Sequence, residues 1–296
     1  VEKLSSQYRT LESLSVMSPW VKAKWEFKAK NYSCRLFIES SDPDGMKGVD
    51  QGKMSKARQA MYPQLKPFRQ AIENKHQWCI AAVPGKAWAK KVFPELSESK
   101  AVEAMWKAIL KASRADGKNP VRAWKEHNED VHARCAYLNA LGLKYLEYKS
   151  ANGTDLTVEL LPDGIFAGGK EKTLKGRGFN PNIPTEEVFT SPKAGAVEGI
   201  VYSTKPLSYM GELIENFSMR FENGKVVEVN AEKGEELLKH MVSMDEGAGK
   251  LGECALISYD SPINESGLLF YNTLFDENAC CHFAVGYGFN ECLKGF

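Results

Sequence analysis

The chain has 296 residues, of which 43% are hydrophobic and 26% are charged. It can therefore bury a substantial core and does not have the composition of a disordered protein. The formal net charge of +1 gives no reason to expect nucleic acid as a partner. No run approaches the roughly 18 consecutive apolar residues of a membrane span, and no basic-then-apolar secretory signal begins the chain.

The cysteines indicate the compartment. Seven are scattered without any C-x-x-C pair, at positions 34, 79, 135, 254, 280, 281 and 292. Most of them have apolar neighbours, which is typical of buried thiols in a reducing environment, so we expect a cytoplasmic protein. A metal-binding or nucleophilic role for Cys254 or Cys281 is the less favoured alternative.

The first half alternates helical and strand-like segments. Residues 1–30 have a helical composition, and their aromatic side chains among lysines favour a half-buried helix over a surface for single-stranded nucleic acid. We expect short apolar strands at 33–39 and 77–83, a long helix ending near residue 74, and further helices at 86–92, 97–113 and 120–141. This alternation predicts an α/β layer domain over residues 1–148.

Two histidines in the last of these helices suggest a zinc helix, but their spacing argues against it. His127 and His132 are five positions apart, which places them roughly 140° from each other around a helix. The H-E-x-x-H pattern needs a four-residue spacing to bring both imidazoles to one face. We therefore interpret both as surface or packing histidines.

The second half is rich in short alternating strands with glycine turns. Asn223-Gly224 predicts a hairpin between residues 217–222 and 225–230, and one helix is expected at 232–244. Gly164 and Gly168-Gly169 are interpreted as turns, because no phosphate-binding pattern is present. We expect residues 149–296 to form an α+β domain built on a curved, mainly antiparallel sheet.

Acidic residues recur where solubility does not explain them. In residues 270–288 an apolar run leads into Asp276 and Glu277, and His282 follows among small apolar residues. Burying such groups costs several kcal/mol unless they are paired or bound to a cation. A metal or catalytic site and a purely hydrogen-bonded polar cluster both remain open for this stretch.

Two further glutamates extend this pattern. Glu187 precedes an apolar pair, and Glu253 stands at the head of an apolar strand. Each has a simpler explanation, as part of a helix-capping segment or as a residue at the rim of a sheet. Together with His282 they supply two oxygen ligands and one imidazole, a set that suits zinc, cobalt or manganese.

These stretches resemble the aminopeptidase T / AmpS type of metallo-aminopeptidase. The resemblance rests on the segments at 182–190, 220–228, 245–248, 251–253 and 272–279, with further matches at 88–94 and 124–127. It implies a two-domain cytosolic enzyme, usually a homodimer, that removes N-terminal residues from peptides. It also implies a water activated by two divalent metal ions, which could be zinc, cobalt, magnesium or manganese.

The resemblance also implies roles for individual residues. Glu187, Glu253 and His282 match the family's metal ligands, and Glu253 could bridge the ions or take a proton from the water. Asp276 and Glu277 are expected to orient His282. The family tyrosine seven residues after that histidine is Phe289 here, so Tyr287 is the candidate catalytic phenol.

One departure concerns the ligand count. The family completes its site with a later His-x-Asp pair, and no residue follows Phe296 in this sequence. We therefore expect a fragment lacking both ends, with an incomplete N-terminal domain and part of the metal-site domain missing. The alternative is a catalytically incomplete or non-enzymatic dimeric binding protein of the same fold.

This departure predicts weak metal binding. Two divalent ions need more ligands than two glutamates and one histidine provide, so the 296-residue chain should bind zinc or cobalt weakly or not at all. A longer chain that contains the His-x-Asp pair should bind two ions. Calorimetric titration of both proteins measures this, and a tight two-ion isotherm for the 296-residue chain would refute it.

Overall fold

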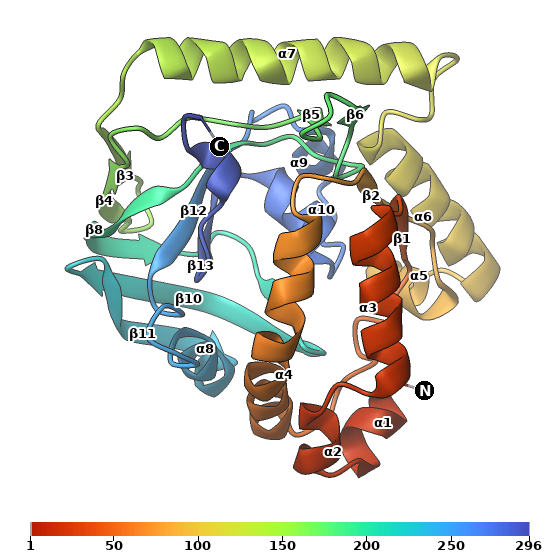
Figure 1. The fold of residues 1–296 in the computed structure, drawn as a ribbon. Helices are drawn as coiled ribbons and strands as arrows, with labels where there is room; N and C mark the ends of the chain where they lie inside the picture. The colour runs from red at the N-terminus through yellow and green to blue at the C-terminus, as the bar shows by residue number, and fades with distance from the viewer. Residues whose placement is uncertain (1, 296) are drawn as a thin grey trace.

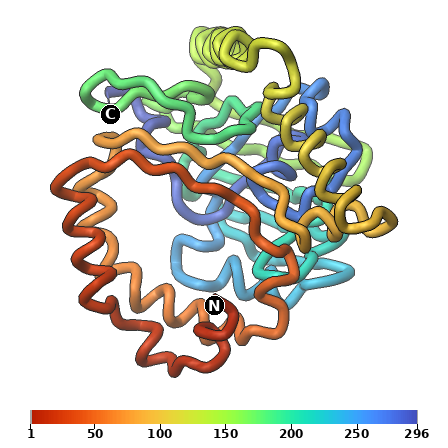
Figure 2. The backbone as a smooth tube through the Cα atoms, turned by 90° about the vertical axis from the view of Figure 1, so that its right-hand side faces the viewer, coloured from red at the N-terminus to blue at the C-terminus, as the bar shows by residue number. Residues whose placement is uncertain are grey.

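The structure is a computed structural model that describes residues 2–295. The N-terminal segment forms a helical arm that extends from the rest of the chain (Figures 1 and 2). It consists of helices α1 (Glu2–Tyr8), α2 (Leu11–Ser15), α3 (Pro19–Asn31) and α4 (Gln51–Ile72). Strands β1 (Arg35–Glu39) and β2 (Trp78–Ala82) pair in parallel. The expected early helices and both short strands are confirmed.

Three helices follow as the sequence predicted. They are α5 (Lys86–Val92), α6 (Glu98–Ala112) and α7 (Pro120–Ala140), and α7 lies along one edge of the molecule (Figure 1). Asn119 caps α7 through its side chain, which accepts from the backbone N–H of Arg122, and a proline at the first position suits the helix start. The inward face of α7 buries Trp124, His127 and Val131.

The larger sheet has the strand order β11-β10-β8-β4-β3, and β9 pairs with one end of β10. Its strands are β3 (Tyr145–Lys149), β4 (Asp155–Leu160), β8 (Pro192–Tyr202), β9 (Leu207–Tyr209), β10 (Glu212–Glu222) and β11 (Lys225–Lys233). All neighbours in it are antiparallel. The predicted hairpin is confirmed, and both Asn223 and Gly224 take the positive φ that its turn requires.

A second, three-stranded sheet has the order β13-β12-β7. It consists of β7 (Val188–Thr190), β12 (Leu251–Leu256) and β13 (His282–Val285), while β5 (Glu171–Lys172) and β6 (Gly178–Phe179) form a separate pair. The remaining short elements are α8 (Glu235–Val242), α9 (Pro262–Ser266), α10 (Thr273–Asp276), η1 (Glu277–Ala279) and η2 (Asn290–Cys292). The fold is thus mixed α/β with antiparallel sheets in its second half.

The two halves of the chain share packing and hydrogen bonds. One core cluster joins Trp88 and Met105 to Phe270 and Phe275. In addition, the Ile80 N–H donates to the Pro181 carbonyl over 2.7 Å, so the segment before β7 lies along β2. The division at residue 148 stays a prediction. No helix within residues 2–295 has the length and apolar character needed to cross a bilayer.

Trp88 should be a large contributor to stability. It is 1% exposed, packs edge-on against Phe275 and donates its indole N–H to the Phe270 carbonyl. Replacing Trp88 with Ala should lower the free energy of unfolding by about 3–5 kcal/mol through the cavity and the lost hydrogen bond. Urea denaturation measures this. Trp106 on α6 is 40% exposed, so Trp106→Ala should cost less than about 1 kcal/mol, and equal costs would contradict the packing described.

Candidate metal centre

Two of the three sequence-predicted ligands lie on adjacent strands, and Glu187 comes directly before the third. His282 opens β13 and lies opposite Ala255 of β12, while Phe189 of β7 lies opposite Ala255 on its other side. Residues directly opposite each other share a face, and residues two apart on one strand share it too. Glu253 and Glu187, which is two residues before Phe189, therefore lie on the same face as His282.

The alternation also explains why these polar groups are close together. Cys254 points to the opposite face and is buried in the main hydrophobic core. On the ligand face, Phe189 and Ala255 pack into a small cluster of their own. Glu187 and Glu253 are each 8% exposed, so the sheet holds two carboxylates largely out of water.

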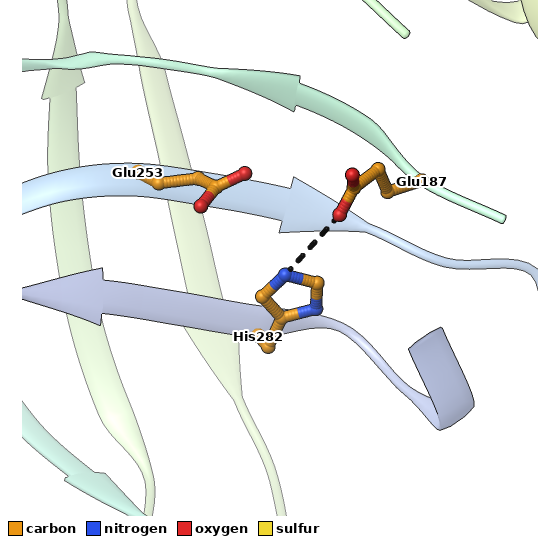
Figure 3. A group of neighbouring side chains, drawn as sticks. All are labelled: Glu187, Glu253 and His282. Atoms are coloured by element: carbon orange, nitrogen blue, oxygen red, sulfur yellow. Dashed lines mark ion pairs between the residues drawn. The ribbon is translucent and has the colours of Figure 1, made fainter. Parts of the chain in front are cut away.

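The functional groups of the three residues converge. One donor atom from each of Glu187, Glu253 and His282 lies within 4.8 Å of the others (Figure 3). The distance from His282 Nε2 to Glu187 Oε2 is 3.5 Å. That separation is at the outer limit of a hydrogen bond, and Nε2 is buried without a hydrogen-bond partner.

The other ring nitrogen of His282 fixes the orientation of the imidazole. Nδ1 lies 3.2 Å from the Cys280 carbonyl oxygen. A carbonyl can only accept, so Nδ1 carries a proton and Nε2 is the atom that faces the carboxylates. The prediction that Asp276 or Glu277 accepts this N–H is wrong, because the Cys280 carbonyl accepts it. Asp276 instead accepts from the backbone N–H groups of Phe270 and Asn272.

The crowding of buried carboxylates shifts the pKa values of several groups in the site. Burial and the neighbouring charge of Glu187 raise the pKa of Glu253 to about 7. Burial and Glu187 also raise the pKa of Glu277 to about 8. Burial alone would lower the pKa of His282, but the facing Glu187 and the other two carboxylates raise it to about 9. The cluster therefore takes up protons when no cation neutralises it.

Two acidic residues near the site were not found from the sequence. Burial and then the charges of Glu291 and Glu187 raise the pKa of Glu171 to about 7. Glu171 comes from β5 and Glu291 from η2, two short elements with no hydrophobic periodicity. The only signal in the sequence was a lone glutamate, between two lysines at 171 and between an asparagine and a cysteine at 291, and such residues are common on surfaces.

The catalytic role of Tyr287 stays a prediction: its backbone packs against Gly252, next to Glu253. Tyr287 is 70% exposed, and Phe289 packs against Phe189 with ring centroids 5.3 Å apart. His127 and His132 separately face the carbonyls of Thr185 and Lys170, so their interpretation as packing or surface histidines is confirmed.

The cysteines fit the prediction only in part. All seven are free, and burial raises the pKa of Cys254, which makes it unreactive. Cys135, Cys254 and Cys292 are buried, but Cys34 and Cys281 are exposed. The expectation of buried thiols is therefore wrong for these two: Cys34 precedes β1, and Cys281 lies between η1 and β13.

The donor set fits a divalent cation. Two carboxylates and one imidazole are ligands that zinc and related ions take in catalytic sites. Nε2 has no hydrogen-bond partner, and its opposite nitrogen is held by a carbonyl, as is usual for metal-binding histidines. A site of this kind on a mixed α/β scaffold is characteristic of a metal-dependent hydrolase.

Comparison with known proteins identifies the family. The model of the family described as thermophilic metalloprotease (M29) matches residues 1–296. Aminopeptidase AmpS of Bacillus subtilis is 43% identical over 293 residues, which cover 98% of this chain and 71% of that protein. Aminopeptidase T of Thermus aquaticus is 45% identical over 264 residues, covering 89% and 64%.

A solved structure agrees with these matches. Wild-type AmpT from Thermus thermophilus superimposes with a TM-score of 0.89 at 40% identity, covering 99% of this chain and 72% of that one. The chain belongs to this family of metallo-aminopeptidases, as the resemblance predicted. It spans about two thirds to three quarters of the length of these relatives.

The geometry predicts the titration of His282. In metal-free buffer, Glu187→Gln should lower the pKa of His282 from about 9, because the neutral amide no longer stabilises the imidazolium. Imidazole chemical shifts followed by NMR against pH measure this. Glu171→Gln removes a carboxylate that does not act on His282 and serves as the control. An unchanged pKa in Glu187→Gln would contradict the arrangement in Figure 3.

Proposed function

We propose that this chain carries the catalytic metal site of an aminopeptidase that hydrolyses N-terminal residues from peptides. The observation that carries the proposal is the convergence of Glu187, Glu253 and His282 on one buried face. Family membership supports the reaction class, since the relatives compared above are named aminopeptidases. The same membership does not favour the non-enzymatic alternative.

The residues present would hold the cation as follows. Glu187 would bind through a carboxylate oxygen and His282 through Nε2, and Glu253 would face the same point from the central strand. We propose two divalent ions, from among zinc, cobalt, magnesium and manganese. Such ions would supply Lewis acidity, which lowers the pKa of water and polarises a peptide carbonyl.

Glu253 is the proposed proton acceptor. The residue is 8% exposed, and its carboxylate lies within 4.8 Å of a donor atom of Glu187 and of His282, so it faces the place where the water would be activated. Its carboxylate can accept a proton from the attacking water and return it to the departing amine. The proposed role of Tyr287 requires its exposed phenol to turn toward the cluster when a peptide binds.

The proposal for the wider assembly is supported by family membership alone. We propose a homodimer in the cytoplasm, with an N-terminal domain that ends near residue 148 and a metal-site domain beyond it. Peptides with a free N-terminus are the proposed substrates.

Glu253→Gln should separate chemistry from folding. In a longer chain that contains the His-x-Asp pair, the amide keeps the shape of the side chain but accepts no proton, so hydrolysis of an aminoacyl anilide should fall at least about 100-fold. Circular dichroism should stay unchanged. The matched control is Glu222→Gln at the exposed end of β10, which should retain full activity. A loss of less than tenfold in Glu253→Gln would end the assignment of Glu253 as the base.

A further inference from the structure

Helix α7 and the metal-site segment are joined by a direct buried contact. His127 on the inward face of α7 is 6% exposed, and its Nε2 lies 2.7 Å from the Thr185 carbonyl oxygen. Because the partner is a carbonyl, Nε2 carries the proton and donates. Thr185 is 3% exposed, and its hydroxyl donates to Glu187 Oε1 over 3.4 Å. A chain of two hydrogen bonds thus runs from α7 to a proposed metal ligand.

Glu186, the residue after Thr185, is also fixed in place. The Glu186 N–H donates to Asn278 Oδ1 over 2.7 Å, and Asn278 is fully buried on η1, four residues before His282. Arg114 pairs with the Glu186 carboxylate through both terminal nitrogens. Glu186 is therefore turned away from the site, while Glu187 on the other side of the backbone is turned into it.

These contacts are needed because strand pairing does not fix the backbone of Glu187. It stands just before β7, outside the ladder that fixes Val188 and Phe189. Its carboxylate also lies within 4.8 Å of the Glu253 carboxylate, and two carboxylates so close repel each other when no cation lies between them. An unsupported glutamate in a loop would relieve this repulsion by turning outward.

We infer that His127 is a positioning residue, which holds the Thr185–Glu187 backbone so that the Glu187 carboxylate stays aimed at Glu253 and His282. This inference rests on the proposed metal site and deepens it. His127 touches neither the cation nor the peptide and acts through the Thr185 carbonyl. Its edge-on contact with Trp124, at 5.4 Å between ring centroids, fixes the ring in place.

The experiment compares three variants in the longer chain that contains the His-x-Asp pair, because the 296-residue chain is expected to bind metal weakly or not at all. His127→Leu removes the N–H, and His127→Gln keeps a donor at a similar reach. His132→Leu is the matched control, because it removes an equivalent bond from α7 to the Lys170 carbonyl. The measurements are the apparent dissociation constant for Co²⁺ by calorimetry and the amide hydrogen exchange of residues 183–190.

The expected results differ between the variants. His127→Leu should weaken Co²⁺ binding about 10- to 100-fold, the usual effect of losing a residue that supports a metal ligand, and exchange at 183–190 should become faster. His127→Gln and His132→Leu should stay within about threefold of the unchanged protein. If His127→Leu does not fold, Thr185→Val takes its place, because it removes the second hydrogen bond and keeps the side-chain shape.

Two results would overturn the inference, and they are distinguishable. Wild-type Co²⁺ affinity in His127→Leu would show a merely structural role, even if its melting temperature fell, and would leave the proposed function standing. Absence of any Co²⁺ binding by the unchanged protein at millimolar concentration would refute the proposed metal site and this inference with it.

Discussion

The repulsion between Glu187 and Glu253 is the constraint around which this structure is organised. Two carboxylates that share one face of a small sheet and are nearly excluded from water would separate if left alone. The chain keeps them together by placing Glu253 on β12 and Glu187 directly before the neighbouring β7, and by adding His282 from β13. Charge compensation then comes from a proton on the cluster or from a cation, and the donor atoms are those that divalent metals prefer.

The surrounding fold supplies rigidity from several directions. Segment 181–187 runs along β2 through Ile80, beneath α7 through His127, and against η1 through Asn278. Gly168 approaches the Glu187 carbonyl so closely that a Cβ there would lie only 2.4 Å from the oxygen. The Glu187 backbone is thus enclosed by elements that come from both halves of the chain.

Much of this could be predicted from the sequence, but not its spatial arrangement. Helical periodicity located α5, α6 and α7, and Asn223-Gly224 located the hairpin, because these signals are local. Glu187, Glu253 and His282 were found through their apolar neighbours and the family resemblance. The pairing order β13-β12-β7 depends on contacts between distant segments, so the shared face could not be derived. For the same reason Glu171, Glu291 and the Cys280 contact of His282 were missed.

That last contact has a consequence for how the site tolerates change. The imidazole of His282 is oriented by a main-chain oxygen two residues earlier, not by a side chain. Every amino acid offers this acceptor, so replacing the thiol at position 280 leaves the acceptor in place. Ring orientation is encoded here by the path of the polypeptide, which only a shift of the η1–β13 turn would alter.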